Sequence, residues 1–456
     1  MRLAFVPLCL ALGACVSAPP QDAATRAVIA DSALPPMKAF SDPRPVAPRL
    51  SNGNIAADFL SLHFQLESGR ALPVFTRFET PITVQVTGKP PFSLGGDLRR
   101  LLTRLRTEAG IQIQQVKATP NGPPASVTIQ AVSRAEIRRA LPQAACFVVP
   151  NVSSLAEFKR ERRSAKTNWA LLRARTKMAI FLPYDASPQE VRDCLHEELA
   201  QAIGPLNDLY RLRESVFNDD NVHTVLTGFD MLVLRATYAP ELQSGMNREQ
   251  VAARLPQLLA RLNPGGIGYA AAPVSATPRS WIDAVQTALG PGSTSPARRR
   301  AVNEAMTIAR DIGWTDHRRA FSHYIAARMM QSYDPETAQR HYATALKYFD
   351  LTPGTELHKA YVATQLVAYS ITQGDGRNAL ARVNPAIEVA TRSENAALLA
   401  TLMLLKAEAL DLTGQTAQAR AVRLDSLGWA RYGFGTDWAV RAKMREIATL
   451  SPINKS

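Results

Sequence analysis

A helical repeat fills the C-terminal third of the chain. From residue 297 onward, apolar residues recur at helical spacing. Matching residues stand at positions i, i+4 and i+7 of three segments: Ala338, Tyr342 and Ala345; Ala379, Val383 and Ala386; and, more weakly, Ala419, Arg423 and Ser426. The first residues of these sets are 41 and then 40 residues apart. The pattern therefore predicts a stack of at least three two-helix units.

The repeat resembles the tetratricopeptide pattern, in which small residues let two antiparallel helices cross closely. Each set follows a small or apolar residue by twelve positions, and a turn glycine recurs in the second and third copies: Ala326, Val367, Ala407, Gly374 and Gly414. The standard period is 34 residues, so these units would be stretched. A generic helical array that binds no peptide is the alternative.

The first fourteen residues predict an export signal. Arg2 is a positive start, Leu3–Leu12 is a short apolar core, and small residues precede Cys15. This string resembles a bacterial lipoprotein box, which implies cleavage before Cys15 and lipidation of its thiol. Val16 follows the cysteine, and the absence of Asp there favours the outer membrane. The alternative is an ordinary signal peptide with a chance cysteine.

The remaining cysteines fit an exported protein. Cys9 would leave with the signal, so Cys146 and Cys194 would remain in an oxidising compartment, where a disulfide is plausible. Two separate buried thiols are the alternative. Beyond the signal, no apolar run is long enough to span a bilayer.

The charge does not identify a nucleic-acid partner. Lys and Arg number 53 against 39 Asp and Glu, for a net charge of +14. Such a surface attracts anions, but the chain has no RNA-binding string, zinc finger or arginine-rich arm. It also lacks a nucleophile elbow, a P-loop and a dinucleotide fingerprint.

Between the signal and the repeat, the periodicity predicts a mixed α/β region. Strands are expected at 78–86, 111–116, 126–132, 146–149 and 178–182, and helices at 97–109, 133–140, 187–203, 227–238, 247–262 and 280–289. The predicted organisation is a signal peptide at 1–14, a Pro/Ala-rich tether at 15–50, an α/β domain at 51–289, a linker at 290–296 and a helical repeat domain at 297–456.

The helix at 187–203 carries the most informative motif. Ser187, Pro188 and Glu190 predict its start with a capping box, and Gly204-Pro205 ends it. Its string H-E-E-L-A-Q-A-I-G-P-L-N resembles the metzincin motif H-E-x-x-H-x-x-G-x-x-H. In that motif, ligands at i and i+4 share one helical face and a glycine turns the chain back toward the zinc.

Aligning the glycine gives the better register. The three ligand positions then hold Glu197, Gln201 and Asn207, Glu198 stands at the general-base position and Gly204 at the turn. Downstream, Ser215-Val216-Phe217 falls where metzincins of the matrixin kind have their Met-turn, with Phe217 in place of Met. The L-T-G-F-D segment at 226–230, followed by Tyr238, resembles the matrixin closing helix.

The combination resembles an uncharacterised bacterial family, domain-of-unknown-function family 2927. The resemblance rests on E-E-L-A-Q-A-I-G-P-L-N-D, on S-V-F-N-D at 215–219 and on the run from Leu234 to Met246. This family brings no assigned activity. The expected fold is a zincin-like (metzincin-like) α/β domain followed by an all-α tetratricopeptide-like repeat domain.

The substituted ligands argue against zinc. Zinc sites use imidazole, thiolate and carboxylate, and only Glu197 of the three positions is such a donor. We therefore expect no metal or other cofactor. His196 and His223 are the histidines that a rearranged site would recruit, but His196 stands about 100° and 140° around the helix from Glu197 and Gln201.

Three functions follow as hypotheses. The first is a lipid-anchored binding or scaffold protein on the periplasmic face of the outer membrane, with an envelope protein or peptide as partner and no nucleic acid. The second is a divergent envelope metallopeptidase that uses Glu198 as general base. The third is a structural envelope protein whose helical array is its only working surface. The sequence does not name the partner, the oligomeric state or the process.

Overall fold

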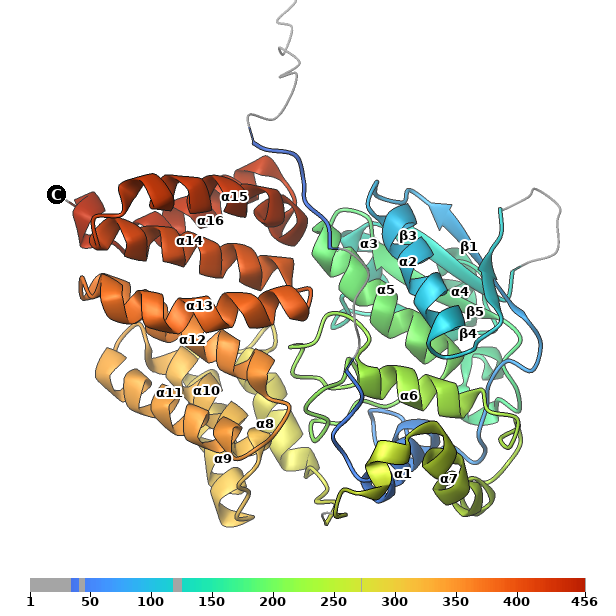
Figure 1. The fold of residues 1–456 in the computed structure, drawn as a ribbon. Coiled ribbons are helices and arrows are strands. Elements are labelled where there is room, and N and C mark those ends of the chain that lie inside the picture. The colour runs from blue at the N-terminus through green and yellow to red at the C-terminus, as the bar shows by residue number, and fades with distance from the viewer. Residues whose placement is uncertain (1–33, 41–45, 118–124, 272, 456) are drawn as a thin grey trace, which may run out of the picture. The chain divides into compact units, whose positions relative to one another are not determined.

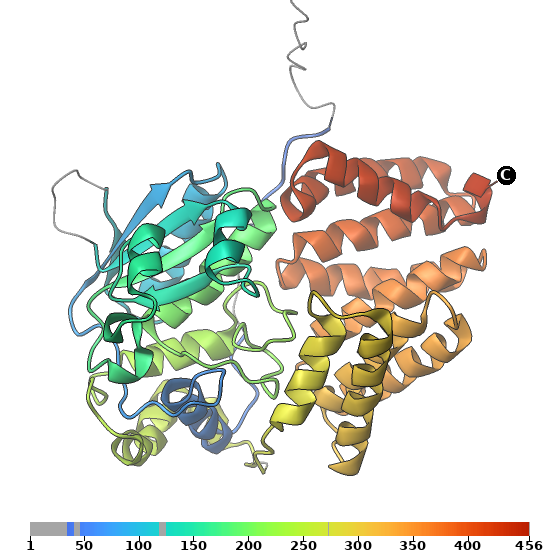
Figure 2. The ribbon, with the colours of Figure 1, turned by 180° about the vertical axis from the view of Figure 1, so that it is seen from behind.

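A five-stranded sheet organises the N-terminal part of the described residues. The computed structural model describes residues 34–40, 46–117, 125–271 and 273–455 (Figures 1 and 2). In this part of the chain the strand order is β2-β1-β3-β5-β4, in which β4 alone is antiparallel to its neighbour. The strands are β1 (Ile82–Gly88), β2 (Ile113–Gln115), β3 (Val127–Val132), β4 (Phe147–Pro150) and β5 (Met178–Pro183).

Helices cover both faces of this sheet. Strand β5 shows why, because its successive side chains point to opposite faces and every residue is buried. Met178, Ile180 and Leu182 join the main core with α2 and α5, whereas Ala179 and Phe181 join a smaller core with α3 and α4. The covering helices are α2 (Leu94–Thr107), α3 (Arg134–Ala140), α4 (Leu155–Glu161) and α5 (Pro188–Ile203).

Three more helices extend the main core. They are α1 (Asn52–Phe64), α6 (Gly228–Thr237) and α7 (Arg248–Leu262). Helix α6 has the capping box that its sequence suggests, with Thr227 and Asp230 bonding to each other's backbone. The sequence did not predict α1, whose start is capped by Ser51.

An all-helical region follows (Figure 1). Its helices pack in consecutive pairs around three successive cores. Their bounds are α8 (Arg279–Leu289), α9 (Ser295–Asp311), α10 (His317–Met330), α11 (Pro335–Asp350), α12 (Glu356–Thr372), α13 (Gly376–Arg392), α14 (Ala396–Leu412), α15 (Thr416–Phe434) and α16 (Asp437–Ala448). The expectation of a C-terminal helical array is confirmed. None of the described helices is both long and apolar enough to cross a membrane.

The repeated residues lie where the paired helices touch. Ala338, Ala379 and Ala419, the first residues of the three sets, are completely buried. Gly374 and Gly414 connect the helices of the second and third pairs with φ angles of 73° and 78°. A side chain disfavours this left-handed conformation, so the glycines permit the tight turns.

The predicted linker connects two helices that share a core. Trp281 and Ala284 of α8 pack in one cluster with Ala301 and Ala305 of α9. Helix α8 precedes residues 290–296, but it thus belongs to the same core as α9, which follows them. The domain boundaries given above stay predictions.

The predicted tether is described in part. Residues 1–33, with the expected signal and Cys15, lie outside the described residues. In the segment 35–40, the Lys38 amide donates to the Gly428 carbonyl at 3.0 Å, and Phe40 stacks on Trp429. This part of the segment therefore packs against α15.

Candidate functional site

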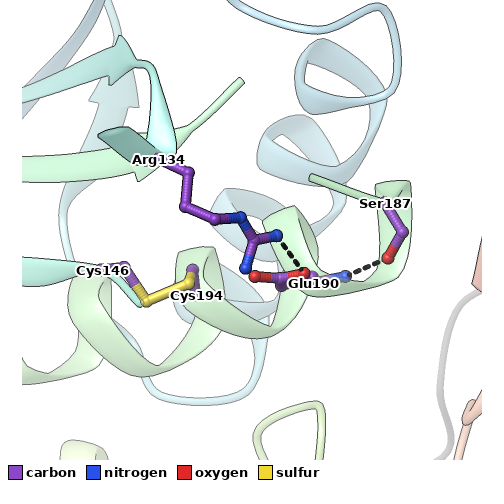
Figure 3. Close-up of a disulfide and its surroundings, with 5 residues drawn as sticks. All are labelled: Arg134, Cys146, Ser187, Glu190 and Cys194. Carbon is purple, nitrogen blue, oxygen red and sulfur yellow. Dashed lines mark hydrogen bonds and ion pairs between the residues drawn. A yellow bond between two sulfur atoms is a disulfide. The ribbon is translucent and has the colours of Figure 1, made fainter. Parts of the chain in front are cut away.

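Helix α5 carries the motif and begins as predicted. The Ser187 hydroxyl accepts a hydrogen bond from the Glu190 amide at 3.2 Å, and Pro188 occupies the first turn (Figure 3). The Glu190 carboxylate accepts from Arg134 at 2.8 Å, so in the described contacts the expected capping box is only half formed. One face of the helix is an apolar stripe that is completely buried and consists of Val191, Leu195, Leu199, Ala202 and Ile203.

A disulfide attaches α5 to the edge of the sheet. Cys146, just before β4, is bonded to Cys194 in the middle of α5, with 6.0 Å between their Cα atoms (Figure 3). The predicted pairing is confirmed. The bond closes a loop of 48 residues and restrains the unfolded chain.

The N-terminal half of α5 contacts the helical array through paired polar groups. Arg192 forms a salt bridge with Glu394, in the turn between α13 and α14, at 3.2 Å, and both side chains are almost fully buried. Gln189 donates to the Asn395 side chain at 3.1 Å and accepts from the Ala397 amide at 2.8 Å. This half of the helix is a structural junction.

The C-terminal half of α5 lies within a group of carboxyl groups. Glu197 and Gln201, four residues apart, share a helical face as the motif requires. The Gln201 amide donates to Asp208 at 3.3 Å. Mutual electrostatic coupling joins five side chains, hereafter the carboxyl cluster: Glu67, Glu197, Glu198, Asp208 and Asp219.

Desolvation and mutual repulsion keep protons on this cluster. Desolvation, then the charges of Glu67 and Asp219, raise the pKa of Glu197 to about 8. Desolvation likewise raises the pKa of Asp219 to about 6, with Glu67 and Asp220 adding to the effect. The pKa values of Glu198 and Asp208 lie well above their ordinary range, again because of desolvation and then the charge of Glu197.

Two cluster oxygens are buried without hydrogen-bond partners in the described structure. They are Oε2 of Glu198 and Oδ1 of Asp208. The positive charge of Arg279, at the start of α8, partly offsets the raised pKa values of Glu67 and Asp219. The Arg279 guanidinium also donates to the Glu67 carbonyl at 3.3 Å. The cluster therefore contains buried carboxyl oxygens that a ligand could contact.

Asn207, at the third ligand position, directs its amide to α1 and not to the carboxyl cluster. The Asn207 amide nitrogen donates to the Ser61 carbonyl of α1 at 3.0 Å. Its neighbour Asp208 joins Glu197 and Gln201 instead. Asp208 ends the E-E-L-A-Q-A-I-G-P-L-N-D string, so its place next to the motif was the signal that the metzincin alignment passed over.

The turn residues have structural reasons for their identity. A Cβ on Gly204 would lie 2.8 Å from Cδ2 of Leu234 and 3.3 Å from the Ala200 carbonyl oxygen, so a larger residue would require the Leu234 side chain to move. Phe217 is completely buried in the main core. Asp230 holds this turn in place because its carboxylate accepts from the Ser215 hydroxyl at 2.5 Å and from the Val216 amide at 3.2 Å.

The two histidines considered for metal are engaged elsewhere. His196 is buried, and its Nδ1 accepts from the Leu226 amide at 3.1 Å. His223 contacts the Arg213 carbonyl through Nε2 at 3.0 Å. Among the described residues, no group of three or more His, Cys, Asp or Glu side chains is arranged to hold a metal ion.

The sequence analysis also missed Arg175, which positions the end of the motif helix. Its guanidinium is buried and donates to the carbonyls of Gln201 and Gly204. These carbonyls lie at the negative end of α5, where a cation is stabilising. Burial lowers the Arg175 pKa to about 10, so the side chain stays charged. Its place before β5 offered no sequence signal.

Comparison with known proteins finds a similarity over one part of the chain. No curated protein and no solved structure matches it. One family model matches, and its match runs from the start of α1 into α7, so it contains the sheet, the motif helix and the carboxyl cluster. Residues 52–257 are therefore similar to the family described as a protein of unknown function (DUF2927).

Proposed function

We propose that this protein is a cell-envelope lipoprotein that binds a partner through a zinc-less, metzincin-like cleft and a helical repeat surface. The observation that carries the proposal is that two of the three ligand positions hold amides, and that both amides donate hydrogen bonds within the chain. Gln201 donates to Asp208, and Asn207 donates to Ser61. Both amides thus serve internal contacts.

The order of elements supports the metzincin-like part of the proposal. A mainly parallel sheet precedes the motif helix, and the turn at 215–217 and the closing helix α6 follow it. The Tyr238 hydroxyl, just after α6, donates to the Ile203 carbonyl at 2.9 Å, which brings the closing helix to the end of α5. This is the succession that the resemblance implies.

The residues present do not fit the zinc ion that a metzincin would hold. Amides compete poorly with water for zinc, and the nearest histidines bond to backbone groups elsewhere. We therefore derive no metal-dependent step.

The carboxyl cluster favours a cationic ligand. Glu197 and Asp219 ionise between about pH 6 and 8, and an ammonium or guanidinium group would stabilise their charged forms. The chain's excess of positive charge makes this local negative group a contrast with the rest of its surface. A basic segment of an envelope protein or peptide is therefore the expected partner.

The disulfide supports export. Disulfides persist in oxidising compartments such as the bacterial periplasm, and Cys146 is bonded to Cys194. Cleavage and lipidation at Cys15, and retention at the outer membrane, complete the proposal. A Cys15→Ala chain should move from the membrane fraction to the soluble periplasmic fraction. Retention of that variant in the membrane would refute the anchor.

The helical array supports a second binding surface. Its paired helices, buried small residues and left-handed turn glycines fit stretched tetratricopeptide-like units. Solenoids of this kind present extended surfaces to partners.

Metal content is the first experiment. The mature chain from residue 16, purified without chelator, is analysed by plasma mass spectrometry beside Glu197→Ala, Gln201→Ala and the exposed control Glu249→Ala. We expect no bound metal in any of the four. Stoichiometric zinc in the wild type and control, lost in the other two, would replace the binding proposal with the metallopeptidase.

Ligand charge is the second experiment. We expect trilysine to bind the wild type more tightly at pH 8.5 than at pH 5.5, because the cluster gains negative charge over that range. Glu197→Gln should weaken trilysine binding, and triglutamate should not bind. Equal affinities at the two pH values would contradict the assignment of the cluster as the ligand site.

A further inference from the structure

A cavity of about 430 Å³ lies between α8, α10 and α12 of the array and the loop 220–222. Most of its lining is apolar or aromatic. These side chains include Val222, Phe321, Tyr324, Ile325, Met329 and Phe349. The volume falls within the range of small-ligand sites, about 300–1,000 Å³.

The charges that line this cavity are unbalanced in favour of cations. Arg298 donates to three backbone carbonyls, of Ala288, Gly290 and Ser293, and these do not cancel its charge. Arg328 is exposed, and its one described hydrogen bond goes to the Tyr324 hydroxyl at 3.2 Å. No described ion pair involves either arginine, and Arg328, which has only this one described hydrogen bond, is available to an anion.

Asp220, the acidic residue in the lining, already has hydrogen-bond donors on both carboxylate oxygens. Asp220 accepts from the Val222 amide at 3.0 Å, from the Asn218 amide group at 2.7 Å and from Nε2 of His358 at 2.8 Å. It therefore has little capacity to attract a cation into the cavity.

His358 supplies a second point of recognition. When Nε2 donates to Asp220, Nδ1 is the ring nitrogen that accepts a hydrogen bond. The side chain is 3% exposed, and its Nδ1 has no hydrogen-bond partner in the described structure. Buried polar atoms of this kind are rare in folded proteins, and a ligand N–H would satisfy it.

We propose that this cavity binds an apolar or aromatic group that carries a carboxylate and an adjacent N–H. The apolar body fills the cavity, the carboxylate pairs with Arg328, and the N–H donates to His358. An N-acylated aromatic amino acid has this chemistry, whether as a free molecule or as the last residue of a peptide. The inference rests on the proposed role of the array as a binding surface and is independent of the carboxyl cluster.

The test compares matched probes on the Cys15→Ala chain, which avoids detergent. The probes are N-acetylphenylalanine, its uncharged amide, 3-phenylpropionate, which lacks the N–H, and acetyl-Gly-Gly-Phe. Calorimetry or ligand-observed NMR gives the affinities. We expect N-acetylphenylalanine to bind about tenfold more tightly than its amide, which corresponds to a single charge-assisted contact, and 3-phenylpropionate to bind more weakly. Equal affinity for the tripeptide assigns the ligand to a peptide end, and loss of binding assigns it to a free acid.

Two variants and a control locate the site. Arg328→Gln should weaken N-acetylphenylalanine about tenfold and leave the amide unchanged, and Met329→Trp should block the cavity. Arg392→Gln is the control, since Arg392 is also an exposed arginine in the last turn of an array helix. No binding by the wild type, or equal binding by the wild type and Arg328→Gln, would overturn the inference. Either result leaves the trilysine and metal measurements as they stand, so it does not test the carboxyl cluster.

Discussion

The two halves of helix α5 use similar side chains for opposite purposes. In the N-terminal half, Arg192 and Gln189 find complementary partners on the array. In the C-terminal half, Glu197 and Glu198 meet Asp208, Asp219 and Glu67, so like charges crowd together. Compensated polar groups hold two parts of a fold together, whereas an uncompensated group stores unfavourable energy that a ligand relieves. The contrast separates the structural junction from the candidate site.

Breaking the junction should have the largest effect on stability. We expect Arg192→Ala to cost about 4 kcal/mol of unfolding free energy, because it removes a buried ion pair between α5 and the array. Arg134→Ala is the control, since its pair with Glu190 is about one-third exposed on both sides and should contribute less than about 1 kcal/mol. Urea denaturation measures both. Equal losses in the two variants would remove the distinction between buried junction and surface pair.

Removing the disulfide should destabilise both halves of α5 together. The Cys146→Ser, Cys194→Ser double variant frees a loop of 48 residues and should lose about 3 kcal/mol. Comparing its urea midpoint with that of the reduced wild type separates loss of the cross-link from the effect of the serines. An unchanged midpoint would mean that the remaining contacts already restrain α5.

The carboxyl cluster should make stability depend on pH. The pKa of Glu197 is about 8 in the folded chain and near 4.5 when unfolded, so the folded state holds the proton more tightly. Its stabilising contribution is full below about pH 4.5 and is lost as the pH rises through 8. Glu197→Gln should therefore raise the melting temperature at pH 8.5 by on the order of 3 °C and change it little at pH 5. The exposed Glu249→Gln should show no such difference.

The smallest effect is expected at Gln201. Gln201→Ala removes one hydrogen bond to Asp208 and should cost about 1 kcal/mol. Gln201→Glu adds another carboxyl to the cluster and should lower stability further as the pH rises. Denaturation at pH 5.5 and 8.5 checks both. A stabilising Gln201→Glu substitution would show that the cluster tolerates more negative charge than its pKa shifts imply.

Much of the local structure followed from short-range patterns. The start of α5 at Ser187-Pro188 and its end at Gly204 match the prediction, as do the five strands to within a few residues. The pairing of Cys146 with Cys194 was also anticipated from compartment and count. These features depend on neighbouring residues or on few alternatives, which is why sequence reasoning reached them.

The candidate site was only half visible. Glu197, Glu198 and Gln201 follow from helical spacing, but Glu67 comes from a loop before β1, far away in the chain, and Asp219 from the loop between α5 and α6. Asp208 was missed because the zinc motif directed attention to Asn207, whose amide contacts α1 instead. Arg175 was missed because its position in the sequence carries no signal of its contact with the end of α5. A tertiary contact also explains why the capping box of α5 is only half formed. The Glu190 carboxylate accepts a hydrogen bond from Arg134 of α3.

The sequence alone determined the helical array, the α/β order and the face of α5 on which Glu197 and Gln201 lie, because periodicity and capping act within a few residues. Tertiary structure decided which charges are compensated. Arg192 and Glu394 are 202 residues apart, and their ion pair forms only because the array packs against α5. The carboxyl cluster likewise exists only because folding brings loops to one helix face, and electrostatic energies depend on distance and solvation rather than on position in the chain.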